Sequence, residues 1–182
     1  MPLQDPHPTY SDVRFSAAEF LRMAQSGAFT DMTVELVAGR LKRRDLPMSG
    51  HSAMQAKLIV QLASAVSPGR VFGTGGIVLD DSTVVLCDAA LSLDVGTEDR
   101  FLTPNDILLV VEIAQTMQGR DMGLKRKLYA QANIPTYWVI DGVRRVVHVY
   151  ADPVEGDYSS VHTVRFGAPL AVPGSDAAIT LD

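Results

Sequence analysis

An almost unbroken apolar run, ILLVVEIA at residues 107–114, constrains the fold of this chain more than any other segment. Half of its residues are Val or Ile, which favour strands, and its one charged residue is Glu112. A strand without polar alternation is typical of a sheet that is buried on both faces. The run therefore predicts an α/β fold, and it raises the question of why an acid lies near the end of such a strand.

The segments on either side of this strand predict helices packed on a mixed sheet. Ser16 and Glu19 have the spacing of a capping box, and Ala38–Gly39 is a plausible hairpin turn. The predicted helices are 16–27, 47–66 and 120–132. The predicted strands and hairpins lie within 33–43, 71–94, 107–114, 136–142, 144–152 and 159–167, and the last two form an antiparallel meander.

Length and composition limit the class of protein. The chain has 182 residues, of which 47% are hydrophobic and 20% charged, as in ordinary globular proteins. Its net charge of −5 argues against a protein that coats nucleic acid through a broad basic surface. One cysteine, Cys87, and four scattered histidines give neither an internal disulfide nor a zinc motif.

The first residues are rich in proline and lack the features of a signal peptide. We expect a flexible arm at 1–14, followed by a single domain at 15–182. Without an apolar run of about 18 residues, we expect no association with a membrane and a cytoplasmic location.

Two acids and one lysine stand where apolar residues are expected. Asp88 interrupts the β-branched run VVLCDAAL, as Glu112 does its own strand. A helical wheel places Lys125 within the apolar arc of its helix, whereas Arg126 and Lys127 point away. The arc is formed by Met122, Leu124, Leu128, Tyr129 and Ala132.

These three residues have two interpretations. The strand of Glu112 could simply reach solvent, while Lys125 could pair with Asp121 or extend its amine to the surface. Alternatively, all three side chains meet at one edge of the sheet. Two adjacent carboxylates raise each other's pKa unless a cation joins them, and Mg²⁺ is such a cation. A bound metal activates water for attack on a phosphodiester, and a nearby lysine can orient that water or neutralise developing charge.

The sequence resembles the Uma2 family of restriction-endonuclease-like proteins, within the PD-(D/E)XK nuclease superfamily. The resemblance extends from about Phe15 to Leu181. Its markers are VELVAGRL, His51, LCDAALSLD, LLVVEIA, RDMGLKRKLYAQANIPTYWVID, VVHVY and APLAVPG. It implies a restriction-endonuclease-like core, a mixed β-sheet flanked by α-helices.

The resemblance also implies roles for individual residues. Asp88 matches the aspartate of the PD element and Glu112 the acid of the next strand, so both are expected metal ligands. The superfamily's lysine would fall at Ala114, but family members resemble one another in a lysine on the next helix, which Lys125 matches between Asp121 and Tyr129. Glu35 matches an early family glutamate and is a further candidate acid. The expected cofactor is Mg²⁺, with Mn²⁺ as a substitute.

Some residues depart from the family pattern or have ordinary explanations. Cys87 replaces a proline, Ala38 an acidic turn residue and Gln115 a serine, and none of the three is an expected metal ligand. We interpret Cys87 as a small buried hydrophobe. For His51 we favour a core or helix N-terminal contact over a catalytic role, and for Tyr137–Trp138 packing over base stacking.

The expected function is therefore a metal-dependent endodeoxyribonuclease that acts on DNA as a homodimer, because cutting both strands usually requires two sites. The alternatives are a catalytically silent nucleic-acid-binding or assembly module of the same fold, and a metal-dependent hydrolase of another phosphoester. The apolar strands TYWVID and RVVHVY could supply dimer edges or faces.

Overall fold

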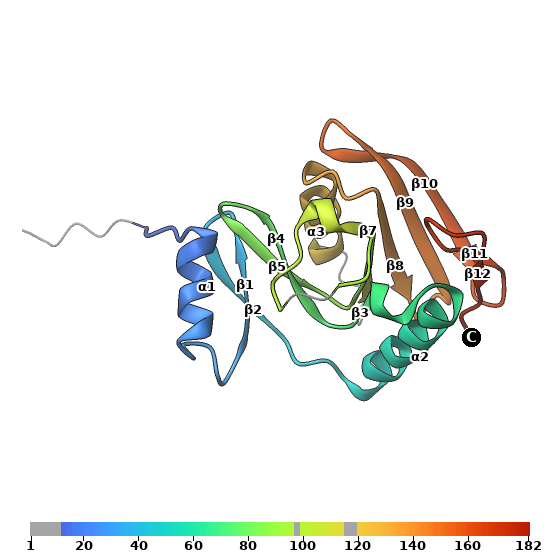
Figure 1. Cartoon of the computed structure of the whole chain (residues 1–182), viewed down its shortest axis with the longest axis horizontal. Coiled ribbons are helices and arrows are strands. Elements are labelled where there is room, and N and C mark those ends of the chain that lie inside the picture. The colour runs from blue at the N-terminus through green and yellow to red at the C-terminus, as the bar shows by residue number, and fades with distance from the viewer. Residues whose placement is uncertain (1–11, 97–98, 115–119) are drawn as a thin grey trace, which may run out of the picture.

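The chain folds into helices and sheets arranged in layers (Figure 1). The computed structural model describes residues 12–96, 99–114 and 120–182. Its helices are α1 (Ala17–Gln25), α2 (Ser49–Ala65) and α3 (Arg120–Gln131), with 3₁₀ turns at Pro68–Arg70 and Pro104–Asp106. Its strands are β1 (Thr33–Val37), β2 (Arg40–Arg44), β3 (Val71–Phe72), β4 (Gly75–Asp80), β5 (Thr83–Cys87), β6 (Ala89–Ser92), β7 (Ile107–Ala114), β8 (Thr136–Asp141), β9 (Val146–Val154), β10 (Asp157–Arg165), β11 (Leu170–Ala171) and β12 (Ala178–Ile179).

The larger sheet has six strands in the order β10-β9-β8-β7-β6-β3. Within it only β7 and β8, which α3 connects, pair in parallel. The other neighbouring strands are antiparallel, so the predicted mixed sheet is confirmed. The predicted strands do not form one sheet, however. A second sheet has the order β2-β1-β5-β4, and the chain passes from it to the larger sheet at Asp88, between β5 and β6. Strands β11 and β12 form a separate pair.

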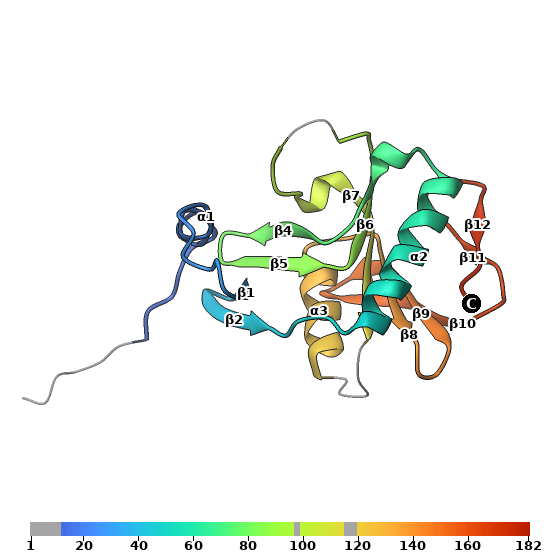
Figure 2. The same ribbon diagram turned by 90° about the horizontal axis from the view of Figure 1, so that it is seen from below.

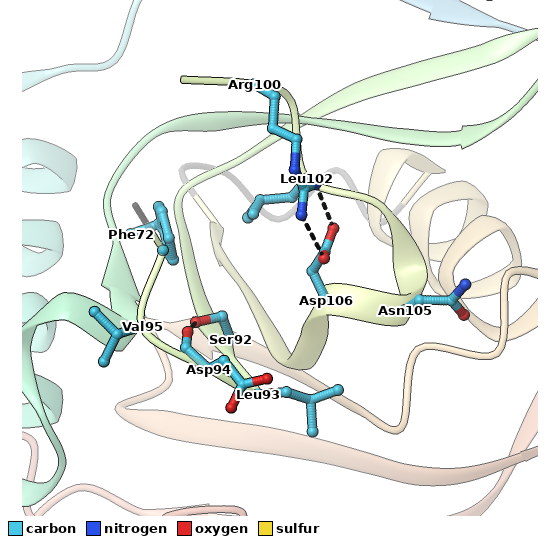
Figure 3. A pocket seen from close by; sticks show the side chains of 10 residues that line it. Phe72, Ser92, Leu93, Asp94, Val95, Arg100, Leu102, Asn105 and Asp106 are labelled. Atoms are coloured by element: carbon cyan, nitrogen blue, oxygen red, sulfur yellow. Dashed lines mark hydrogen bonds and ion pairs between the residues drawn. The ribbon is translucent and has the colours of Figure 1, made fainter. Parts of the chain in front are cut away.

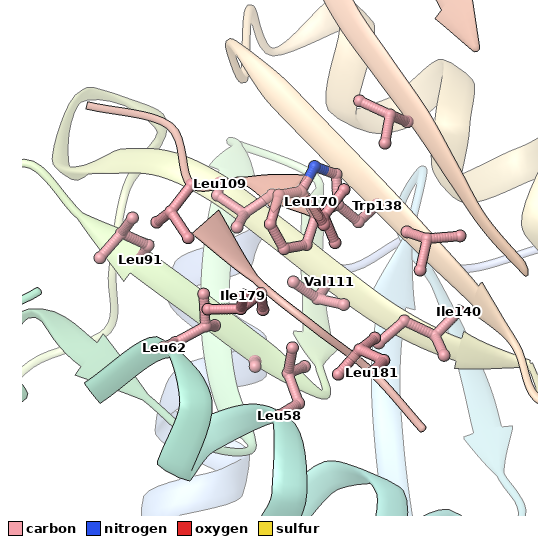
Figure 4. Packing of buried hydrophobic residues seen from close by; sticks show 14 of the residues in the cluster. Leu58, Leu62, Leu91, Leu109, Val111, Trp138, Ile140, Leu170, Ile179 and Leu181 are labelled. Atoms are coloured by element: carbon pink, nitrogen blue, oxygen red, sulfur yellow. The ribbon is translucent and has the colours of Figure 1, made fainter. Parts of the chain in front are cut away.

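Strand β7 is buried on both faces, as its apolar run predicts. Alternation along the strand sends Leu109 and Val111 toward the core beneath α2. There they pack with Leu58 and Leu62 of α2 and with Trp138 of β8 (Figure 4). Val110 points the opposite way, and Glu112 shares its side of the strand.

The opposite face of the larger sheet packs against α3 and the four-stranded sheet (Figure 2). Tyr129 and Ala130 of α3 meet Val110 of β7 and Tyr137 of β8 in this core, which also includes Cys87. Glu112 therefore points into a space between α3 and the two sheets rather than into solvent. The interpretation that its strand reaches solvent is wrong, because only 8% of this residue is exposed.

Local sequence signals position the elements that approach this space. The capping box between Ser16 and Glu19 starts α1, as predicted. The β1–β2 hairpin turns at Ala38 and Gly39, which both have positive φ, 49° and 77°. The end of the predicted N-terminal arm contacts this turn, since Arg14 Nη1 donates to the Ala38 carbonyl at 2.6 Å. Residues 1–11 of the arm lie outside the described structure.

Two expectations about individual elements are wrong. Leu124, placed on the apolar arc of α3, is 45% exposed, whereas Arg126 is half-buried against Asp157 and over the Tyr150 ring. Arg126 thus packs through an ion pair and a ring contact, where hydrophobicity alone suggests a solvent-facing side chain. Of the edges or faces expected from β8 and β9, the edges are excluded, because each strand is paired on both sides and the edges of the described sheet are β10 and β3.

No helix among the described residues is both long enough and apolar enough to span a membrane.

Candidate functional site

Asp88 lies at the junction of the two sheets, where one buried carboxylate is held from several directions. Its backbone N–H donates to the Val111 carbonyl at 3.1 Å, which ties the junction to β7. Its Oδ2 accepts a hydrogen bond from the Ile113 backbone N–H at 2.7 Å, and only 2% of the residue is exposed. The break in the strand at Asp88 therefore directs an acid toward the end of β7.

The first turns of α2 complete the surroundings of Asp88. His51 Nε2 lies 2.9 Å from Asp88 Oδ2 and must donate to it, since a carboxylate only accepts. Its Nδ1 is buried and has no hydrogen-bond partner among the described residues. Gln55, one helical turn later, donates from Nε2 to the Asp88 carbonyl at 2.6 Å. A helix N-terminal polar contact, the favoured interpretation of His51, agrees with this position.

Glu112 is held by α3 through one of its two oxygens. Oε1 accepts from the Tyr129 hydroxyl at 2.8 Å and lies 2.9 Å from Lys125 Nζ. Oε2 lies 3.5 Å from Nη2 of Arg44 at the end of β2. The same Nη2 lies 2.6 Å from Asp88 Oδ1. One guanidinium nitrogen therefore faces both acids, and the two carboxylates lie side by side.

Lys125 and Glu35 meet on the far side of Glu112. Lys125 Nζ lies 2.9 Å from Glu35 Oε1 and donates to the Leu86 carbonyl at 2.6 Å. Glu35 Oε1 also accepts from the Leu86 N–H at 2.8 Å, so β1, β5 and α3 are joined at this point. The ammonium group therefore donates hydrogen bonds to Glu112 and the Leu86 carbonyl and forms an ion pair with Glu35. The alternative pairing of Lys125 with Asp121 concerns a side chain outside the described structure.

Burial and charge act against each other within this cluster. Burial raises the pKa of Glu112, although Lys125 attracts its charged form. Burial alone would lower the pKa of Lys125, but attraction to Glu112 and Glu35 outweighs it and the pKa is raised. For Arg44 burial is likewise outweighed by the nearby acids, so its pKa is raised as well. Both bases stay charged, and three carboxylates outnumber two cations by one.

Sequence reasoning brought together Asp88, Glu112, Lys125 and Glu35 but missed Arg44 and Gln55. Arg44 belongs to the basic strand RLKRR, in which nothing local shows which arginine points inward. Gln55 could have been found, because it follows His51 by four residues and so shares its helix face. Cys87 is buried, as expected, and burial raises the pKa of its thiol to about 12. Gln115 lies outside the described residues.

The donor chemistry of the two central acids fits a magnesium ion. Among the described residues no group of three or more His, Cys, Asp and Glu side chains is arranged to hold a metal. Mg²⁺, however, keeps several waters and is often bound by only one or two carboxylates. Asp88 Oδ1 and Glu112 Oε2 both face one cationic nitrogen, which shows that their charges are directed at a common point.

A hollow at the other end of β6 is separate from this cluster (Figure 3). It has a volume of about 260 Å³ and includes Phe72, Ser92, Asp94 and Val95 in its lining. In its wall, Arg100 donates two hydrogen bonds to Asp106, so these two charged side chains pair with each other. None of the clustered acids and bases lines it.

Comparisons with known proteins identify the fold and the family of this chain. A crystal structure described as "a putative nuclease belonging to DUF820 from Anabaena variabilis ATCC 29413" matches with a TM-score of 0.66 and 21% identity. The match covers 87% of this chain and 89% of that one, and at this identity it shows a shared fold. A search of curated proteins finds no match. The model of the Uma2 family, described as "Putative restriction endonuclease", matches residues 17–181. Because this match spans almost the whole chain, including the acids of β1 and β7, the aspartate between β5 and β6 and the lysine of α3, the protein belongs to the Uma2 family.

Proposed function

We propose that this protein is a cytoplasmic, Mg²⁺-dependent DNA endonuclease that hydrolyses phosphodiester bonds with a metal-activated water. One observation carries the proposal. Asp88 and Glu112 direct one oxygen each toward a common cationic nitrogen, and Lys125 contacts the other oxygen of Glu112. Membership of a family described as restriction endonucleases supports the same activity.

The charge of the cluster supports dependence on a metal. With Asp88, Glu112 and Glu35 facing Arg44 and Lys125, the site has an excess of negative charge and would repel a phosphate. Asp88 and Glu112 would hold Mg²⁺, or Mn²⁺ in its place. The bound ion would lower the pKa of a coordinated water and stabilise charge on a phosphoryl oxygen.

The remaining residues would set the positions of these ligands. The Ile113 N–H and His51 hold Oδ2 of Asp88, while Tyr129 and Lys125 hold Oε1 of Glu112. Such contacts orient metal ligands and fix which oxygen is presented to the ion. Lys125 would also place a positive charge beside the reacting phosphate, and Glu35 would keep that ammonium in place.

Incubation of the purified protein with supercoiled plasmid and short duplexes tests the activity. We expect cleavage with Mg²⁺ or Mn²⁺ and none with EDTA. Asp88→Asn should abolish it, because the amide keeps the volume but loses the ligand charge. Asp81→Asn, in the exposed turn between β4 and β5, is the matched control and should cleave normally. Equal cleavage by the wild type and Asp88→Asn, or none by folded wild type, would reject the proposal.

A silent nucleic-acid-binding or assembly module is the second candidate. It is favoured by Arg44, whose guanidinium contacts both acids, and by the net charge of −5. Retention of duplexes in a gel-shift assay without cleavage at any metal concentration would favour this candidate. Hydrolysis of a small phosphodiester such as bis(p-nitrophenyl) phosphate, with intact DNA, would indicate a hydrolase of another phosphoester.

We also propose that the protein acts as a homodimer. Two-fold assembly would supply two sites for the two strands of a duplex. Strand β10 forms an edge of the larger sheet, and its Val161 is exposed. An unpaired strand edge is a ready partner for a second copy, so we expect the two chains to meet there.

A further inference from the structure

Each central acid has one oxygen that the described residues hold for positioning and one that faces Arg44. Asp88 Oδ2 accepts from the Ile113 N–H and His51, whereas Oδ1 contacts Arg44 Nη2 at 2.6 Å. Glu112 Oε1 is held by Lys125 and Tyr129, whereas Oε2 contacts the same Nη2 at 3.5 Å. The guanidinium thus occupies the point at which a shared cation would bind both acids.

Of the charged side chains in this cluster, that of Arg44 can most easily turn away from the acids into solvent. Arg44 is the last residue of β2, which is an edge strand of the four-stranded sheet. Its side chain is 24% exposed, against 14% for Lys125 and 5% for His51. It also donates a hydrogen bond from Nη1 to the Leu86 carbonyl at 3.2 Å, an acceptor that Lys125 also uses. A long arginine side chain at a strand end can turn to solvent without moving the backbone.

Charge balance favours the exchange of Arg44 for a divalent ion. When Asp88, Glu112 and Glu35 are all ionised, their charge exceeds that of Arg44 and Lys125 by one unit. A divalent ion in place of the guanidinium would make the cluster neutral while Lys125 stays in position. In a buried site the removal of such an excess charge is strongly favourable.

We propose that Arg44 is an internal competitor for the metal: it occupies the cation position between Asp88 and Glu112 and must turn outward before a divalent ion binds. This inference rests on the proposed function for the place of the metal, but not on any cleavage activity. It means that the apparent affinity for metal equals the intrinsic affinity multiplied by the fraction of molecules in which Arg44 is withdrawn. Arg44 would then set the metal concentration at which the site is loaded.

Calorimetric titration of Mn²⁺ and Mg²⁺ into Arg44→Gln tests the proposal without measuring activity. If Arg44 occupies the site in nine of ten molecules, its removal lowers the apparent Kd about tenfold. The metal should also raise the Tm of Arg44→Gln by more than that of the wild type, because the variant leaves two acids without this cation. Arg43→Gln is the matched control, since Arg43 is exposed on the same strand, and its Kd should equal that of the wild type.

Asp88→Asn in the Arg44→Gln background should bind no metal, which locates the titrated ion. A Kd for Arg44→Gln equal to or weaker than that of the wild type would overturn the competition, even if the wild type cleaves DNA. Absence of metal binding in both proteins would overturn it as well. If Arg44→Gln does not fold, Mg²⁺ titration of the wild type followed by the Arg44 Nε–Hε NMR signal replaces it. A saturable shift supports displacement, and an unchanged signal at saturating metal contradicts it.

Discussion

The ammonium nitrogen of Lys125 lies 2.9 Å from Oε1 of Glu112, and this contact joins the middle of α3 to the C-terminal end of β7. Three consecutive basic residues, Lys125, Arg126 and Lys127, have three different environments. The first contacts buried acids, the second pairs with Asp157 on β10, and the third is exposed. If only the positive charge of the helix mattered, replacing any of the three would have the same effect. Their different contacts predict different effects.

Lys125→Met should impair both cleavage and folding, while Lys127→Met should impair neither. Loss of a preorganised cation lowers cleavage on the order of 10²-fold. The variant also leaves Glu112 and Glu35 buried without their shared partner, a loss of about 3 kcal/mol in the free energy of unfolding. The exposed Lys127 should change that free energy by less than about 0.5 kcal/mol. Plasmid cleavage and urea denaturation measure the two effects. Equal cleavage rates and equal free energies of unfolding for the two variants would contradict the role assigned to Lys125.

Tyr129→Phe and Tyr137→Phe remove the same atom from two buried rings that pack 5.1 Å apart. The Tyr129 hydroxyl donates to Glu112, and a hydrogen bond to a charged group contributes about 2 kcal/mol. The Tyr137 hydroxyl has no hydrogen-bond partner among the described residues, so its removal should cost nothing. Thermal or urea unfolding of both variants checks the difference. A larger loss for Tyr137→Phe would contradict the assignment of these contacts.

Asp106 should make the stability depend on pH in the acid range. Hydrogen bonds from Arg100 hold the pKa of Asp106 well below its ordinary value. Burial acts in the opposite direction, and hydrogen bonds from Thr103 lower the pKa further. A lowered folded-state pKa stabilises the protein above the unfolded-state pKa, and this contribution is lost as the pH falls toward the folded-state pKa. Asp106→Asn should therefore destabilise clearly at pH 7 and progressively less below about pH 4.

Urea denaturation of Asp106→Asn at several pH values, with Asp81→Asn as the exposed control, measures this dependence. A difference from the wild type that stays constant from pH 7 to pH 3 would show that the Asp106 charge is not responsible. The same residue forms a capping box with Thr103, so part of the loss at pH 7 belongs to that turn.

The proposed homodimer predicts a mass in solution of twice 19.7 kDa. Val161→Lys on the β10 edge should shift the mass to that of the monomer, because a charge at the edge of a sheet opposes pairing. Val60→Lys, at an exposed position of α2, should leave the dimer intact. Light scattering at micromolar concentration measures the mass. A wild-type value of 19.7 kDa would reject the dimer.

Local patterns predicted the three helices and most of the strands, but not the short pair β11 and β12. The apolar run 107–114, the capping box at Ser16 and the Ala38–Gly39 turn each depend on residues close in sequence, and each is present in the structure. The apolar arc of α3 was less reliable, because Arg126 pairs with Asp157, which is 31 residues away. A helical wheel contains no information about a partner on another strand.

The residues that interrupt the apolar strands are visible in the sequence, and for this reason Asp88 and Glu112 could be predicted as site residues. The partners that hold these two acids depend on tertiary packing. Arg44 lies 44 residues from Asp88 and 68 from Glu112, and His51 lies 37 residues from Asp88. Such contacts arise because the chain changes sheets at Asp88 and brings the end of β2 and the start of α2 to one place. Propensity and periodicity act over a few residues, whereas the charge balance of a buried site depends on how distant elements pack.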